Sequence, residues 1–118
     1  MLLKGGFNVF LLKSLTQTGS KYVFKPNEAH LNVYDTVHGG IISSLIDITT
    51  SLEVMKVHEN HGVSVDLSVQ YIRALSTTFT LEPIVEKIGK SLIFTSCQVY
   101  DSNRRLAAVG RHIKMYKK

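Results

Sequence analysis

The alternation of hydrophobic and polar positions predicts one long helix followed by a strand. From Ile41 to about Val57 the residues are apolar or small on most of a helical circumference, and no proline or glycine interrupts them. A helix that is apolar on nearly all sides is typical of a buried element. After Gly62 the period changes to two, and apolar residues alternate with polar ones from Val63 to Tyr71. This alternation is the clearest strand signal in the chain.

Three further strands are expected after this one. They span 79–85, 91–100 and 105–116, with turns at Gly89-Lys90 and 101–104. Pro83 makes the first of them less regular. In the last strand one face is predicted to be apolar and to contain Ala107, Val109, Ile113 and Met115. Short connections make neighbouring strands antiparallel.

The N-terminal part is predicted to hold a short amphipathic helix within 1–13, a strand at 21–25 and a loop at 27–40. The basic start also has some character of a transit peptide, although it lacks arginine, so the helix is favoured. The element order indicates a single α+β domain, residues 1–118, with a curved antiparallel sheet wrapped around one central helix. Such a sheet leaves an edge strand, which pairing with a second copy would cover.

Composition narrows the class of protein. The chain has 118 residues, 44% hydrophobic and 19% charged, which is typical of one globular domain and not of a disordered chain. No run of apolar residues is long enough to span a membrane. Cys97 is the one cysteine, so no internal disulfide forms, and we expect it in the core. No histidines and cysteines have zinc-site spacing, so no metal is expected.

The net charge of +5 favours anionic partners, but the basic residues do not form one block. A solvated basic surface is the simpler interpretation, and an anionic ligand is the second. Nucleic acid is not expected as a partner, because no helix combines basic and polar residues in a reading motif.

The segment 32–47 contains the residues that best suit chemistry. Gly39 and Gly40 open the helix, and the unpaired amides there suit an oxygen that gains negative charge. His38 precedes them, either as a cap or as an orienting group. Asp47 follows two turns later inside the apolar stretch. A buried carboxylate is costly without partners, so Asp47 is either a structural group bonded to amides or a catalytic one.

These motifs together resemble hotdog-fold acyl-CoA thioesterases of the 4-hydroxybenzoyl-CoA thioesterase superfamily. The likeness is to the eukaryotic thioesterase-superfamily-member type and to the bacterial phenylacetate-pathway type. It covers about residues 30–116 and rests on Asn32, His38-Gly39-Gly40, Asp47, and the stretches 62–67, 71–73, 89–92 and 110–112.

The resemblance implies hydrolysis of an acyl-CoA without a metal or redox cofactor, by a homodimer or a dimer of dimers. Asp47 then matches the catalytic carboxylate, acting as general base or nucleophile, and the Gly39 amide polarises the thioester carbonyl. Asn32 and His38 match orienting residues. Ser64 matches a serine that positions water or substrate and is contributed by the other subunit.

The resemblance also implies a set of CoA contacts: Asp66, Tyr71, Ile72, Arg73, Ala74, Leu75, Ser76, Lys87, Gly89, Lys90, Ser91 and Leu92. The basic members of this set suit the phosphates of CoA. The chain departs from the family pattern at two positions. Asp35 stands where the family usually has glycine, and Ala74 replaces a common proline.

These two departures keep an alternative open, a non-catalytic acyl-CoA-binding module on the same fold. A hydratase or dehydratase is less favoured, because a mid-helix Asp47 fits hydrolysis better. The compartment is expected to be the cytosol or the mitochondrial matrix. The remaining histidines are interpreted as surface residues: His30, His58 and His61 in loops, and His112 beside Arg111 on a strand.

Overall fold

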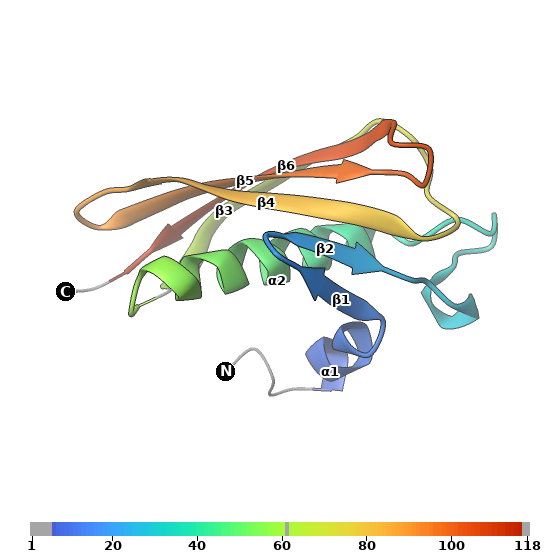
Figure 1. Ribbon diagram of the computed structural model, residues 1–118, viewed down its shortest axis with the longest axis horizontal. Helices are drawn as coiled ribbons and strands as arrows, with labels where there is room; N and C mark the ends of the chain where they lie inside the picture. Colours follow the sequence, from blue (N-terminus) through green and yellow to red (C-terminus); the bar gives the residue numbers. More distant parts are fainter. Residues whose placement is uncertain (1–5, 61, 117–118) are drawn as a thin grey trace.

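The computed structural model describes residues 6–60 and 62–116, in which a curved sheet wraps around one long helix (Figure 1). The elements are α1 Gly6–Leu12, β1 Leu15–Thr18, β2 Lys21–Phe24, η1 Glu28–His30, α2 Gly39–Val57, β3 Val63–Tyr71, β4 Phe79–Ile88, β5 Leu92–Tyr100 and β6 Leu106–Met115. The six strands form one antiparallel sheet in the order β1-β2-β4-β5-β6-β3. The predicted architecture is thus confirmed. The expected start of the N-terminal helix, residues 1–5, lies outside the described residues.

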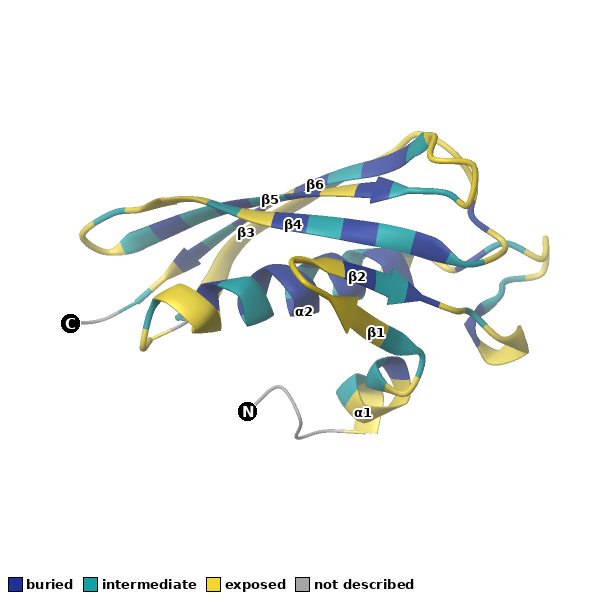
Figure 2. Cartoon of the chain, in the orientation of Figure 1, coloured by how far each residue is buried: buried dark blue, intermediate teal, exposed yellow. Residues whose placement is uncertain are grey.

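The core lies between α2 and the concave face of the sheet. Leu45 and Ile46 of α2 are fully buried, as are Phe24, Leu81 and Val99 of the strands (Figure 2). Burying a side chain of this size stabilises the fold by about 1.5–3 kcal/mol. Cys97 is buried in the same cluster, as predicted. Among the described residues no helix is long and apolar enough to cross a membrane.

Three elements differ from the expectation. The short β1, Leu15–Thr18, lacks apolar alternation and forms through its hairpin with β2, in which Gly19 has a φ of 64°. The predicted loop contains η1, which Asn27 caps with its side chain. The strand that contains Pro83 continues to Ile88. Pro83 is tolerated because β2 pairs with β4 only from Phe79 to Leu81, so β4 has an open side beyond that point.

The predicted apolar face of β6 points away from α2, so it is not the face that meets the helix. The buried residues that alternate toward α2 are Ala108, Gly110, His112 and Lys114, whereas Val109 and Ile113 are only partly buried and Met115 is exposed. Small and polar residues face the helix because α2 approaches this strand closely. A β-carbon on Gly110 would lie 2.7 Å from Cγ2 of Ile46.

A bulge changes the alternation in β3. Ser64 pairs with Lys114 and Asp66 pairs with Ile113, so the register shifts between them. Residues directly opposite in an antiparallel pair lie on the same face. Ser64 therefore faces α2, as does Leu67, which pairs with His112. Strict alternation would have placed Ser64 and Leu67 on opposite faces.

Gly110→Ala is expected to lower the free energy of unfolding by about 1–3 kcal/mol, because the added methyl group overpacks the contact with the buried Ile46. Urea unfolding measures this change. Gly6→Ala is the matched control, since a β-carbon there meets no atom within 4 Å among the described residues. Equal stability of the two variants would show that α2 and β6 do not constrain each other at Gly110.

Candidate active site

The loop before α2 is organised by Asn32. Its Oδ1 accepts hydrogen bonds from the backbone N–H groups of Tyr34 at 2.8 Å and Thr36 at 3.2 Å, and its Nδ2 donates to Thr36 Oγ1 at 2.9 Å. Asp35 inside this loop has a φ of 60°, in the left-handed region that favours glycine. Aspartate tolerates this conformation, so the loop accommodates Asp35 at the position where the family resemblance implies glycine.

His30 holds the same loop through hydrogen bonds to Asn27 and His38, and its predicted surface position is wrong. Its side chain is fully buried between the rings of Phe10 and Phe24, whose centroids lie 4.8 and 4.9 Å away. Its Nδ1 accepts the N–H of Asn27 at 2.9 Å, and its carbonyl oxygen accepts the N–H of His38 at 3.1 Å. Burial lowers the pKa of His30, so the ring is held neutral.

The first turn of α2 presents backbone amides. The N–H groups of Ile41 and Ile42 bond to the carbonyl oxygen of His38, at 3.0 and 3.2 Å. The amides of Gly39 and Gly40 come before these bonds and have no backbone partner among the described residues. They are donors available to an oxygen at the helix start.

Tyr71 covers this turn. Its hydroxyl donates to the carbonyl oxygen of Gly39 at 2.7 Å and also hydrogen-bonds Ser43 Oγ. A β-carbon on Gly39 would lie 3.3 Å from Cζ of Tyr71, so glycine permits the contact. A cavity of about 260 Å³ opens beside it, lined by Gly39, Tyr71 and, further along the β3–β4 loop, Ile72, Arg73, Ala74 and Leu75. Sequence reasoning missed Ser43.

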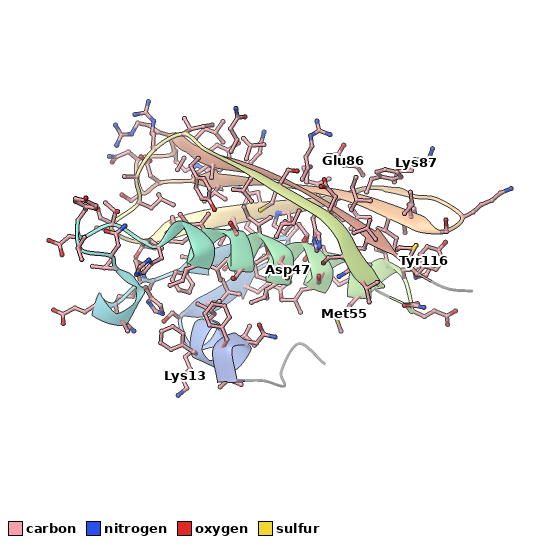
Figure 3. All side chains as sticks on the ribbon, turned by 180° about the vertical axis from the view of Figure 1, so that it is seen from behind. Lys13, Asp47, Met55, Glu86, Lys87 and Tyr116 are labelled. Carbon is pink, nitrogen blue, oxygen red and sulfur yellow. The ribbon has the colours of Figure 1, made fainter. Side chains whose placement is uncertain are left out.

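A second polar group lies further along α2, around Asp47. Oδ1 of Asp47 is 3.6 Å from Nε2 of His112 and 3.4 Å from Oγ of Ser51. The Asp47 side chain is 44% exposed, so the expectation of a fully buried carboxylate is wrong. Asp47 lies at mid-helix beneath β3 (Figure 3), where the sheet ends and leaves the carboxylate partly open.

His112 connects Asp47 to Ser64 and Thr50, and its predicted surface position is also wrong. The residue is fully buried, with Nδ1 2.8 Å from Thr50 Oγ1 and Nε2 2.6 Å from Ser64 Oγ. Burial lowers the pKa of His112, and the nearby Asp47 carboxylate opposes part of that shift. The signal in the sequence was the run of small or polar residues at every second position from Gly110 to Lys114.

One chain does not bring all the candidates together. Gly39 and Asp47 are separated by eight residues of one helix, so they lie about 12 Å apart along its axis. Residues 71–76 lie by the start of α2, whereas the β4–β5 hairpin with 87–92 lies at the other end of the molecule, where Figure 3 shows Lys87. Asp66 shares a face with Ile113, away from α2.

No group of three or more His, Cys, Asp or Glu side chains in the described parts of the chain is arranged to hold a metal ion. The polar groups of the candidate site are the Gly39 amide at the start of α2 and the Asp47 carboxylate with its hydroxyl and imidazole partners. This set suits acyl transfer to water, which needs an oxyanion donor and a base or nucleophile.

Comparison with known proteins defines the class. The thioesterase superfamily model matches residues 34–108, and the chain belongs to this family. The chain is 33% identical to acyl-coenzyme A thioesterase 13 of Homo sapiens over 94 residues, which cover 76% of this chain and 67% of that protein. The family and the hotdog fold inferred from the motifs are confirmed.

Solved structures agree with this assignment. Zebrafish thioesterase superfamily member 2 superposes with a TM-score of 0.86 at 28% identity, covering 98% of this chain and 90% of the other. A Bacillus halodurans protein solved with CoA superposes with a TM-score of 0.78 at 17% identity, covering 95% and 91%, which is a likeness of fold.

The buried, neutral histidines predict a pH-dependent stability. An unfolded chain protonates both imidazoles as the pH falls through about 6.5, while the folded state resists protonation because the pKa of His30 and of His112 is lowered. The free energy of unfolding is therefore expected to fall between pH 7.5 and 5.5, with a slope of at most about 1.4 kcal/mol per pH unit for each histidine.

Urea unfolding at several pH values measures the slope, which should be smaller in His112→Gln than in the control His58→Gln, whose imidazole is only half-buried. The same slope in wild type and His112→Gln would contradict the effect of burial on His112.

Proposed function

We propose that the protein hydrolyses an acyl-CoA to a free acid and CoA, in sites formed between two copies of the chain. The observation that carries the proposal is the Asp47 carboxylate in the middle of α2, held by Ser51 and His112 and half open to solvent. The similarity to acyl-coenzyme A thioesterase 13 supports acyl-CoA as the substrate class. Cys97 as the single cysteine suits a reducing compartment such as the cytosol or the mitochondrial matrix.

In this mechanism the thioester carbonyl oxygen accepts a hydrogen bond from the backbone N–H of Gly39, at the positive end of α2. Asp47 takes a proton from a water molecule that attacks the carbonyl carbon, or attacks it directly. The carbon–sulfur bond then breaks, and the CoA thiolate leaves and is protonated. Asn32 and His38 hold the loop that carries the amide. Ser64, bonded to His112, orients the carboxylate side of the site.

The geometry argues that the two halves belong to different subunits. A reacting carbon must lie about 3–3.5 Å from its attacking atom while its oxygen contacts the donor. The roughly 12 Å between Gly39 and Asp47 along α2 is too long for both to act on one carbonyl. Ser64 lies on the same half as Asp47, because His112 of the same chain contacts both. In this arrangement Ser64 comes from the other subunit relative to Gly39, but from the same subunit as Asp47.

The edge strand β3 provides the means of assembly. Among the described strands it pairs only with β6, and four of its large apolar side chains are exposed: Val63, Val65, Leu67 and Tyr71. β3 runs from the Ser64 end to the Gly39 end, so antiparallel pairing of two copies around a two-fold axis places Tyr71 of one near Ser64 of the other. Each dimer then holds two sites, which combine Gly39 of one copy with Asp47 of the other.

The same pairing unites the CoA candidates. Residues 71–76 of one copy approach the hairpin 87–92 of the other, where Arg73, Lys87 and Lys90 suit the phosphates. The CoA bound to the Bacillus halodurans protein of the same fold supports a CoA site in this architecture. Asp66 lies on the far face of β3, so it contacts CoA only where the ligand crosses that edge. A dimer of dimers remains a prediction of the family resemblance.

The first test is thiol release from a panel of acyl-CoAs with short, long and aromatic acyl groups. Asp47→Asn is expected to lose activity by orders of magnitude, and Gly39→Pro, which replaces the amide hydrogen with the proline ring, by about 10²–10³-fold. Proline suits the first helical position. Gly39→Ala is the matched control, because its β-carbon makes the same 3.3 Å contact with Tyr71 but the N–H remains.

No thiol release by folded wild type, together with saturable acyl-CoA binding, would instead favour the non-catalytic binding module. A Gly39→Pro variant as active as Gly39→Ala would exclude this amide as the oxyanion donor.

Mixing two inactive variants tests the shared site. In a mixed dimer of Gly39→Pro and Asp47→Asn, one of the two sites carries both defects and the other site carries neither. Unfolding and refolding a one-to-one mixture should therefore restore about a quarter of wild-type activity, because half of the dimers are mixed and each has one intact site. Each variant refolded alone serves as the control. No recovery in a mixture shown by mass spectrometry to contain mixed dimers would place both groups of one site in a single chain.

A further inference from the structure

Lys114 is a buried lysine that forms no ion pair with any carboxylate of the described residues. It lies on β6 opposite Ser64 of β3 and is 4% exposed. Its Nζ donates to Oγ of Ser51 at 2.8 Å. The mechanism above does not use this residue.

Stability does not explain Lys114. Removing an ammonium group from water is costly, and a neutral hydroxyl compensates for little of that cost. Burial accordingly lowers the pKa of Lys114, and the carboxylate of Asp47 acts in the opposite direction. A methionine would fill a similar volume without this penalty. Lys114 is therefore buried at a cost in stability, and it lies beside a candidate catalytic carboxylate. This combination indicates a functional role.

Ser51 links Lys114 to that carboxylate. It lies one turn after Asp47 on α2, is 1% exposed, accepts from Lys114, and donates to Oδ1 of Asp47 at 3.4 Å. His112 approaches the same oxygen, with Nε2 at 3.6 Å. Both contacts therefore fall on Oδ1, and Oδ2 is the oxygen available to a water molecule or a thioester.

We propose that Lys114 is a positioning residue that acts through Ser51 to orient Asp47, so that Oδ2 faces the reacting group. The charged and titratable groups around Asp47 are His112 and Lys114 from β6 and, acting on His112, Asp66 from β3. The consequence for turnover rests on the proposed function, whereas the electrostatic link between Lys114 and Asp47 does not.

The link is measured by NMR of the side-chain nitrogen of Lys114 across a pH titration, with Lys114→Met identifying the resonance. Asp47→Asn is expected to lower the midpoint of the Lys114 titration by about half a pH unit or more, because the carboxylate that opposes the effect of burial is lost. Glu82→Gln is the matched control, since it removes a carboxylate that pairs with the exposed Lys21. An unchanged Lys114 midpoint in folded Asp47→Asn would overturn the proposal.

Turnover gives the second readout. We expect kcat to fall about tenfold or more in Lys114→Met and in Ser51→Ala, with KM within about twofold, because the loss lies in the reacting step. Ser51→Thr and Lys114→Arg, which keep the hydroxyl and the charge, should retain most of the activity. The double variant should be no slower than the slower single variant, since both residues act through one contact. An unchanged kcat in Lys114→Met would overturn the positioning role.

The two readouts fail separately. If wild type releases no thiol, the proposed function fails, while the titration of Lys114 still decides whether this lysine and the Asp47 carboxylate interact.

Discussion

The structure depends on the close approach of α2 to β6. Gly110 lacks a side chain where Ile46 packs, so a β-carbon there would come within 2.7 Å of Ile46 Cγ2. This approach places the next residues of β6 that face the helix, His112 and Lys114, against the polar side of α2. His112 reaches Thr50 and Asp47, and Lys114 reaches Ser51. A wider spacing between helix and sheet would separate these groups, so the packing of an apolar contact sets the geometry of the polar one.

The length of α2 imposes a second constraint. The helix rises 1.5 Å per residue, so its N-terminal amides and its mid-helix carboxylate lie far apart. Within one chain they are too far apart to contact the same carbonyl group. In the described part of the chain, β3 is also unpaired on one side and exposes apolar residues there. In the proposed dimer this edge of β3 binds the second copy and lies next to Asp47. Assembly and the proposed catalysis therefore both depend on β3, and the bulge at Ser64 turns its hydroxyl toward His112.

Much of the fold was predictable from periodicity, because α2 and β3 to β6 are long and have regular patterns. Gly39 and Asp47 were also found from local chemistry, since glycines at a helix start and a carboxylate in an apolar helix are visible without coordinates. His112 and Lys114 were not found, because the direction in which a strand residue points depends on which face meets the helix, and on β6 that face has fewer large apolar residues than the other. Ser64 was named from the family resemblance, but strict alternation does not show the bulge in β3 that turns it toward His112. His30 was misplaced because its burial comes from aromatic residues distant in sequence.

The buried ionisable groups lie at the two parts of the candidate site. His30, His112 and Lys114 are all buried with a lowered pKa; His30 lies under the loop that leads to Gly39, and His112 and Lys114 lie beside Asp47. The apolar cluster formed with β2, β4 and β5 contains large side chains such as Tyr22, Phe24, Phe79 and Leu81. Stability is therefore supplied mainly on one side of α2, and the other side is left to groups that a purely stabilising core would replace. A chain selected for stability alone would place an apolar residue at 114, and the lysine there is best explained by what it does for the carboxylate two contacts away.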